Sequence, residues 1–191
     1  MKTINKIALV VSKIMEVFHW IVAAFMVAVL ACSVFAGDWF GSILTDGASE
    51  LGETLSTYGF EIVAVNSDGT VNMTAVALFS VGAIIILSLM AMVFRNVYLI
   101  LKTAKGETWF SDGKTPFQKN IVRMVREIGI FSIAVPVVGL IMSIICRLVL
   151  GVETAETSVN IQGFIMGILV LCLSHIFSYG TQLQEDVDGL V

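Results

Sequence analysis

The sequence has few charged residues, and it has only two prolines and two histidines. Of its 191 residues, 14% are charged, where about 25% is usual for a soluble domain. By contrast, 57% are hydrophobic and the mean hydropathy is +0.93. A soluble globule of this size buries only about two-thirds of the surface that its unfolded chain exposes, which leaves no room for so much apolar area. The composition therefore argues against a soluble domain, a disordered chain and a nucleic-acid binder.

Motifs of enzyme chemistry are also missing from the sequence. There is no CxxC or HExxH metal-ligand spacing, no glycine-rich phosphate loop and no nucleophile elbow. No charge lies in the middle of a long hydrophobic run, where proton relays and coupled transporters place one. We therefore expect no catalytic residue, no metal site and no cofactor.

Long hydrophobic runs dominate what is present. Four of them contain about 20 mainly apolar residues each, which is the length of a helix that crosses a hydrocarbon core of about 30 Å. They lie at approximately residues 14–36, 74–101, 121–149 and 159–182. Barrel strands need shorter segments with strict alternation, which these are not. We predict an all-α membrane protein, a bundle of four transmembrane helices that forms one integral membrane domain over residues 1–191.

The distribution of charge predicts the orientation of these helices. Ten of the eleven Lys and Arg residues lie in the first 13 residues or between residues 95 and 126, and Arg147 is the exception. Residues 37–73 contain six acidic residues and no basic one. Because Lys and Arg collect in cytoplasmic loops, we expect both termini and the loop 102–120 to be cytoplasmic. The same rule places the loop 37–73 outside a bacterial cytoplasmic membrane.

The outer loop 37–73 is too long for a simple turn. Residues 58–65 are rich in strand formers, 66–69 read Asn-Ser-Asp-Gly, and 70–73 can return as a second short strand. We predict a small β-hairpin that turns at 66–69. The acidic residues of this loop fit solvation and orientation better than cation binding, because they lack the dense spacing of a calcium loop.

The cytoplasmic loop 102–120 contains a helix-start signal. Thr115 is a good N-cap, Pro116 suits the first helical position, and Gln118 is placed to complete a capping box. A helix is therefore expected to begin at Thr115. Its predicted apolar face consists of Phe117, Ile121, Met124 and Ile128.

A basic stripe is expected beside that apolar face. It consists of Lys119, Arg123 and Arg126, and Trp109 and Phe110 lie just upstream as candidate interfacial anchors. Such a stripe attracts anionic lipid at the membrane surface. We interpret these five residues as lipid-facing, with docking of a cytoplasmic partner as the alternative. The acidic tail, Glu185, Asp186 and Asp188, is a further candidate to pair with the stripe.

Small residues and one proline predict how the helices pack. Gly163 and Gly167 form a GxxxG pair in the last run, a pattern that lets two helix backbones approach closely. The pattern does not distinguish packing within one chain from packing between chains. Pro136 lies inside the third run and is expected to kink its helix.

The two histidines and two of the cysteines form candidate pairs. His19 and His175 are predicted at similar depth near the inner ends of their helices, which suits axial ligands of a b-type haem. No motif supports haem, and the simpler interpretation places His19 in the inner aromatic belt and gives His175 a hydrogen bond to a neighbouring helix. Cys32 and Cys146 are both predicted near outer helix ends, where either a disulfide or buried free thiols are possible.

Several segments resemble one known family. Residues 106–111 (GETWFS), 115–120 (TPFQKN), 126–129 (REIG) and the closing segment 176–191 resemble the signature of a bacterial multi-pass family catalogued as domain of unknown function 2975. The family has no assigned activity, supplies no catalytic residue, and is often encoded beside a small helix-turn-helix regulator. The resemblance therefore implies a membrane sensor or regulator.

Three functional hypotheses follow from the sequence. The leading one is a non-enzymatic membrane sensor or regulator that works through the cytoplasmic loop and tail. The second is an oligomeric ion channel or small transporter, assembled through Gly163 and Gly167. The third is an immunity or interaction protein that binds a partner through the acidic outer loop. The lipid bilayer is the expected partner of each, and direct contact with nucleic acid is not expected.

Overall fold

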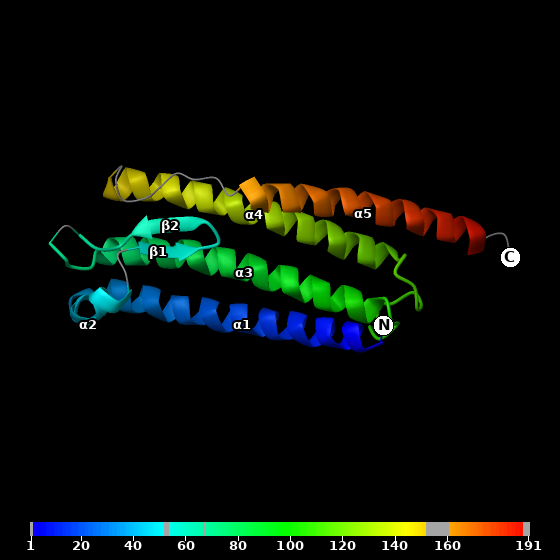
Figure 1. Cartoon of the computed structure of the whole chain (residues 1–191), viewed down its shortest axis with the longest axis horizontal. Helices are drawn as coiled ribbons and strands as arrows, with labels where there is room; N and C mark the ends of the chain where they lie inside the picture. Colours follow the sequence, from blue (N-terminus) through cyan, green and yellow to red (C-terminus); the bar gives the residue numbers. More distant parts are fainter. Residues whose placement is uncertain (1, 52–53, 67, 152–160, 189–191) are drawn as a thin grey trace. The chain divides into compact units, whose positions relative to one another are not determined.

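The fold consists of long helices and one short hairpin (Figure 1). The structure is a computed structural model, and it describes residues 2–51, 54–66, 68–151 and 161–188. Within these residues the elements are α1 (Lys2–Phe35), α2 (Gly37–Leu51), β1 (Thr54–Thr57), β2 (Phe60–Val63), α3 (Met73–Thr103), α4 (Lys119–Leu150) and α5 (Ile161–Asp188).

Four of these helices are long and apolar enough to cross a membrane. The spans that qualify are Asn5–Phe35, Met73–Thr103, Lys119–Leu150 and Ile161–Val187. They contain 31, 31, 32 and 27 residues, so each exceeds the roughly 20 residues that a bilayer core requires. The predicted bundle of four membrane-spanning helices with a small hairpin is confirmed, and the chain is an integral membrane protein.

The chain divides into two compact units, and each long helix except α5 contributes substantially to both. Unit 1 comprises Met1–His19, Leu89–Ala134 and Gln162–Val191, and unit 2 comprises Trp20–Ser88 and Val135–Ile161. Unit 1 contains ten of the eleven Lys and Arg residues, whereas the acidic segment 37–73 belongs to unit 2. Unit 1 therefore contains most of the basic residues, and unit 2 contains the acidic segment.

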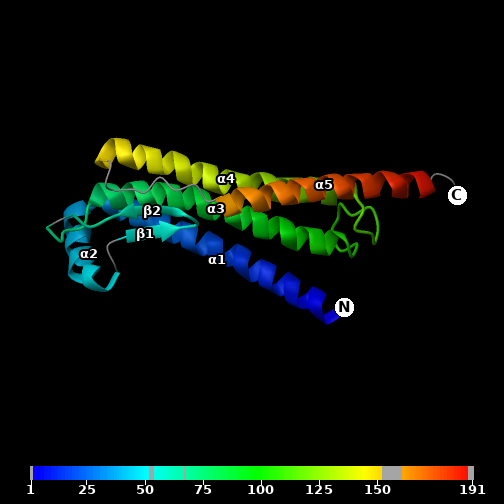
Figure 2. The ribbon, with the colours of Figure 1, turned by 45° about the horizontal axis from the view of Figure 1, so that its top comes forward.

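In unit 1, the second half of α3 lies between the first half of α1 and the pair formed by α4 and α5 (Figures 1 and 2). The core of this unit centres on Ile121, Met124 and Val125 of α4, all buried. Residues packed against them come from three other segments: Leu99, Ile100 and Ala104, then Phe110, and finally Val170 and Phe177. Two residues of the predicted apolar face, Ile121 and Met124, thus face the core, whereas Ile128 is half-buried and Phe117, which precedes α4, is 40% exposed.

Two glycines let α4 and α5 approach closely. A Cβ atom built on Gly167 of α5 would lie 2.5 Å from Cγ1 of Ile133 and 3.0 Å from the carbonyl oxygen of Gly129. A Cβ atom on Gly129 would in turn lie 2.8 Å from two side-chain carbons of Leu171. Gly167 therefore packs within this chain, while its predicted companion Gly163 is half-buried. Gly129 is the second glycine of the contact, and the sequence analysis did not select it.

Replacement of Gly167 by Ala is expected to destabilise the protein by about 1–3 kcal/mol, the usual cost of forcing extra atoms into a packed contact. The backbone of α4 stands in the way, so the new methyl cannot be accommodated by a side-chain rotation. Thermal unfolding in detergent measures the change. Gly41→Ala is the matched control, because a Cβ there meets only Met73 at 3.7–3.8 Å. Equal stability of the two variants would contradict the close crossing.

Unit 2 contains a helix that the sequence analysis did not predict. Residues 37–51 were assigned to an irregular outer loop, but they form α2. Trp39, Phe40, Ile43 and Leu44 repeat at helical spacing, and Asp38 in the first turn stabilises the positive end of the helix dipole. Phe40 and Leu44 line an apolar cavity of about 330 Å³ together with residues of α1, the hairpin segment and α3.

The hairpin exists, but its position in the sequence differs from the prediction. β1 and β2 pair antiparallel with Thr57 opposite Phe60, so the turn is Tyr58-Gly59. Both turn residues have positive φ, 47° and 85°, as a two-residue type I′ turn requires. The predicted turn at 66–69 is a second reversal of the chain, where Val65 and Val71 form an isolated bridge and the amide of Asn66 donates to the carbonyl of Thr70 at 2.8 Å. The Asn-to-Gly signal therefore marks this second turn and not the turn between β1 and β2.

The turn at 66–70 is nevertheless held by a carboxylate outside the spans. The hydroxyl of Thr70 donates to Oδ1 of Asp68 at 2.6 Å, and the amide of Thr70 donates to the same atom at 3.0 Å. These two hydrogen bonds hold the pKa of the Asp68 carboxyl below its ordinary value. Their contribution is present at neutral pH and is lost as the pH falls through that lowered pKa.

β2 packs onto the helices of unit 2 through Phe60. This side chain is fully buried, and its ring stacks on Phe79 of α3 with the centroids 5.6 Å apart. Gly82 of α3 leaves the space for it, since a Cβ there would lie 2.8 Å from the Phe60 ring. Gly139 of α4 lies against the Cβ of Phe60, where an added Cβ would sit 3.6 Å away. Phe60 thus anchors the hairpin to α3 and α4.

Replacement of Phe60 by Ala is expected to cost about 3–5 kcal/mol, because it leaves a cavity that the two helices cannot close. Equilibrium unfolding in detergent gives this value, and limited proteolysis of the 54–71 segment reports whether the hairpin has come loose. Glu61→Ala serves as the control, because Glu61 lies on the exposed face of the same strand. The anchor role fails if both variants lose the same stability.

Candidate functional site at the loop between α3 and α4

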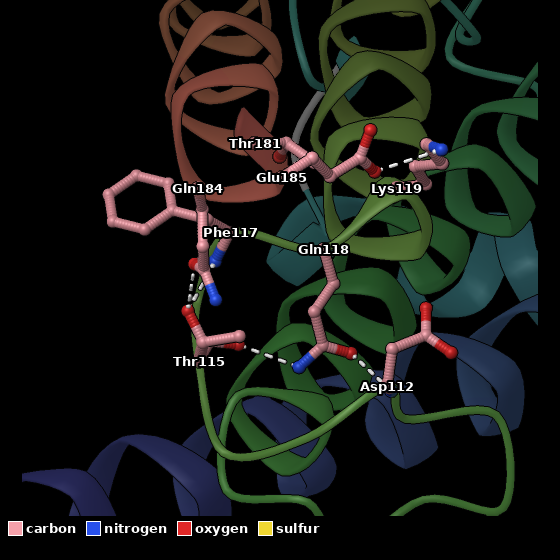
Figure 3. Close-up of a pocket in the computed structure, with 8 residues that line it drawn as sticks. All are labelled: Asp112, Thr115, Phe117, Gln118, Lys119, Thr181, Gln184 and Glu185. Atoms are coloured by element: carbon pink, nitrogen blue, oxygen red, sulfur yellow. Dashed lines mark hydrogen bonds and ion pairs between the residues drawn. The ribbon is translucent and has the colours of Figure 1, made fainter. Parts of the chain in front are cut away.

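The loop between α3 and α4 belongs to unit 1 and is closely bonded to its surroundings. α4 begins at Lys119, not at Thr115 as predicted. The predicted capping box does not form, because the side chain of Gln118 points into the loop (Figure 3). The first bond of α4 instead runs from the amide of Val122 to the carbonyl of Gln118.

Gln118 holds the loop together. It is only 3% exposed. Its Nε2 donates to the carbonyl oxygens of Thr115 at 2.6 Å, Gly113 at 3.1 Å and Thr103 at 3.3 Å. Its Oε1 accepts the amide hydrogen of Asp112 at 2.9 Å. One carboxamide therefore satisfies carbonyls from the end of α3 and from both halves of the loop.

Two polar contacts join this loop region to the end of α5. The hydroxyl of Thr115 donates to Oε1 of Gln184 at 2.8 Å. Nζ of Lys119 lies 2.9 Å from Oε1 of Glu185, and both groups are largely exposed. In Figure 3 each of these side chains points toward its partner. The predicted pairing of the tail with the basic stripe is confirmed for Glu185, whereas Asp186 is exposed and the side chain of Asp188 lies outside the described residues.

An aromatic contact accompanies these polar ones. The ring of Phe117 lies 6.0 Å from that of Phe177 on α5. A Cβ on Gly180 would lie 2.6 Å from the Phe117 ring, so the glycine lets the ring lie directly against α5. These contacts surround a cavity of about 230 Å³. Its lining consists of Asp112, Thr115, Phe117, Gln118, Lys119, Thr181, Gln184 and Glu185 (Figure 3).

The basic stripe is exposed along its whole length. Lys119, Arg123 and Arg126 are all exposed, and they border a cavity of about 420 Å³ with Ser178 and Gln182 of α5. The two candidate aromatic anchors differ from each other. Trp109 is 95% exposed, but Phe110 packs against the buried cluster of α4 and is not an exposed anchor.

A further cavity of unit 1 lies between α3 and the start of α4. Most of its polar residues were not among those selected from the sequence. It measures about 500 Å³ and includes Arg95, Asn96 and Glu127. The Nδ2 of Asn96 donates to Oε2 of Glu127 at 3.0 Å, and Nε of Arg123 lies 3.5 Å from Oε1 of the same carboxylate. In the sequence, Arg95 and Asn96 interrupt an apolar run, and this interruption is the pattern that could have indicated a polar site.

The two histidines are not brought together. His19 is 1% exposed, its ring lies 5.2 Å from that of Phe94 on α3, and its Nδ1 lies 2.7 Å from the carbonyl oxygen of Met15. His175 is exposed on α5. In unit 1 the second half of α3 lies between the two helices that contain these histidines (Figures 1 and 2). One histidine is buried and the other is exposed, which does not fit two axial ligands of one enclosed haem. Among the described residues, no group of three or more His, Cys, Asp or Glu could hold a metal ion.

The remaining predicted residues lie in unit 2 or on its border. Cys32 is half-buried and Cys146 is buried, and both are free thiols. Pro136 is buried inside α4, next to the point where the two units divide. Glu153 and Glu156, the acidic residues nearest to Arg147 in the sequence, lie outside the described residues.

Comparisons of the chain with protein-family models, with curated proteins and with solved structures found no match.

Replacement of Gln118 by Glu is expected to destabilise the protein by about 1–3 kcal/mol. The change removes the donor of three hydrogen bonds, and it places a carboxylate oxygen against the same three carbonyl oxygens. Chemical denaturation in detergent, with protease cleavage in the loop as a local reporter, measures both effects. Gln182→Glu makes the same change on the exposed surface of α5 and is expected to stay within about 0.5 kcal/mol of wild type. Similar losses in both variants would contradict the role of Gln118.

Proposed function

We propose that the chain is a non-enzymatic sensor or regulator of a bacterial cytoplasmic membrane that acts through the loop between α3 and α4 and the end of α5. The observation that carries this proposal is the pair of contacts Thr115–Gln184 and Lys119–Glu185. Each contact joins the loop region to an α5 side chain. A movement of α5 along α4 therefore changes both contacts, and through them it changes the position of the loop.

The proposed orientation places this loop and both termini in the cytoplasm and the hairpin outside. Its support is the concentration of Lys and Arg in unit 1 and the acidic character of segment 37–73. The regulator role draws further support from the resemblance of residues 106–129 and 176–191 to the multi-pass family named above, whose members often accompany a helix-turn-helix regulator.

Anionic lipid is the proposed partner of the exposed stripe Lys119, Arg123 and Arg126. These three cations and the exposed Trp109 provide a charged and aromatic surface at the end of the spans, as membrane anchors do. The loop would then be held at the membrane surface, where changes in α5 are transmitted to it.

The test is a variant in which both contacts are broken, Thr115→Ala with Glu185→Lys. In a host strain lacking the chain, wild-type protein is expected to restore a defined set of expressed genes, measured by RNA sequencing. The double variant is expected to lose most of that response, because neither contact can form. Its amount in the membrane and its topology, read by cysteine labelling from each side, should match wild type.

Asp186→Lys is the matched control, since it makes the same charge change one residue away from the ion pair and should keep the response. Two results would overturn the proposal: loss of the chain without any change in gene expression, or ion conduction by the wild-type protein in liposomes. The second result would favour an oligomeric channel.

A further inference from the structure

The cavity between α3 and α4 is lined by both polar and apolar residues. Its polar lining includes two guanidiniums and two carboxamides, from Arg95 and Asn96 on α3 and from Asn120 and Arg123 on α4. Its apolar lining consists of Met92, Leu99, Phe110, Met124 and Trp109. The volume of about 500 Å³ is in the range of sites that hold small ligands.

The polar lining of the cavity is positively charged once the contacts among its own residues are counted. The carboxylate of Glu127 is the acidic group in the lining, and its two oxygens are engaged by Asn96 and Arg123. Arg95 is exposed and forms no ion pair with any side chain that the structure describes. A guanidinium presents several donors in a fork that matches the oxygens of a phosphate group. The cavity therefore favours a phosphate-bearing ligand.

The apolar lining distinguishes between the sources of such a phosphate. A free phosphate ion gains nothing from methionine, leucine and phenylalanine side chains, whereas a phospholipid buries its first acyl carbons against them. Trp109, which is also in the lining, is 95% exposed, and an exposed tryptophan beside basic residues is typical of the membrane interface. We propose that this cavity binds an anionic phospholipid, with its phosphate at Arg95 and Arg123.

The structure suggests that Asn120 and Glu127 position the site. The Nδ2 of Asn120 donates to the carbonyl oxygen of Phe110 at 2.9 Å, and this bond holds Phe110 at the start of α4. Glu127 holds the Nε edge of the Arg123 guanidinium, and the other donors of that group remain available to a ligand. The lipid is thus recognised at a built cavity, which goes beyond the general attraction between the basic stripe and a charged membrane.

A tryptophan-quenching experiment tests this site. Trp20→Phe and Trp39→Phe leave Trp109 as the single tryptophan in the full chain, which is reconstituted in mixed vesicles of phosphatidylglycerol and phosphatidylcholine. Bromine atoms are carried on one lipid at a time. Brominated phosphatidylglycerol is expected to quench Trp109 more strongly than brominated phosphatidylcholine at equal mole fraction. Arg95→Gln and Arg123→Gln are each expected to lower this preference about fivefold, the effect of one cation near a charged lipid.

Lys114→Gln is the control, because it removes one exposed charge from the same loop outside the cavity. Arg95→Lys keeps the charge but loses the fork, and we expect an intermediate preference. Equal quenching by the two lipids overturns the proposal, and so does a loss in Lys114→Gln as large as that in Arg95→Gln, which indicates diffuse attraction. A preference abolished by excess inorganic phosphate at constant ionic strength assigns the cavity to free phosphate instead. None of these results depends on the proposed regulatory role, so the two proposals fail separately.

Discussion

The hydrocarbon core of a membrane holds no water to hydrogen-bond a peptide group, so each peptide group must find its partner within the protein. This constraint explains why the chain forms uninterrupted helices of 27–32 residues, one of which continues through Pro136. It also governs the buried hydroxyls. Ser80 donates to the carbonyl of Val76 and Ser143 to that of Gly139, four residues back in the same helix. Among the described side chains no buried polar atom lacks a partner.

Because each helix satisfies its own backbone polar groups, the packing between helices depends on the shapes of the side chains and on a few side-chain polar contacts. Gly129 and Gly167 bring two backbones together, and Gly82 makes room for Phe60. Asn96 with Glu127 is a polar contact that joins two long helices. Such contacts are few, so each has a large effect on how the helices are arranged. The cavity between α3 and α4 includes one of these contacts, because Asn96 and Glu127 both line it.

The loop shows why local sequence rules can fail at a functional position. Thr115-Pro116-Phe117-Gln118 satisfies the rules for a helix start, yet α4 begins later. The carbonyls of Thr103 and Gly113 compete for the side chain of Gln118, and they reach it only in the folded loop. The hairpin is a parallel case, because the strand that contains the buried Phe60 begins after a Tyr58-Gly59 turn that local turn chemistry did not indicate.

Hydropathy and charge by themselves determined that the chain has four spanning helices, and they gave the expected orientation, because lipid transfer and loop charge act on each segment separately. The apolar face at the start of α4 was also readable from residue spacing. Which residues meet was decided only by the tertiary structure: the burial of His19 against Phe94, the pairing of Lys119 with Glu185, and the assembly of Arg95 and Arg123 around one cavity. Contacts between distant segments depend on how the helices cross, and no single segment contains that information.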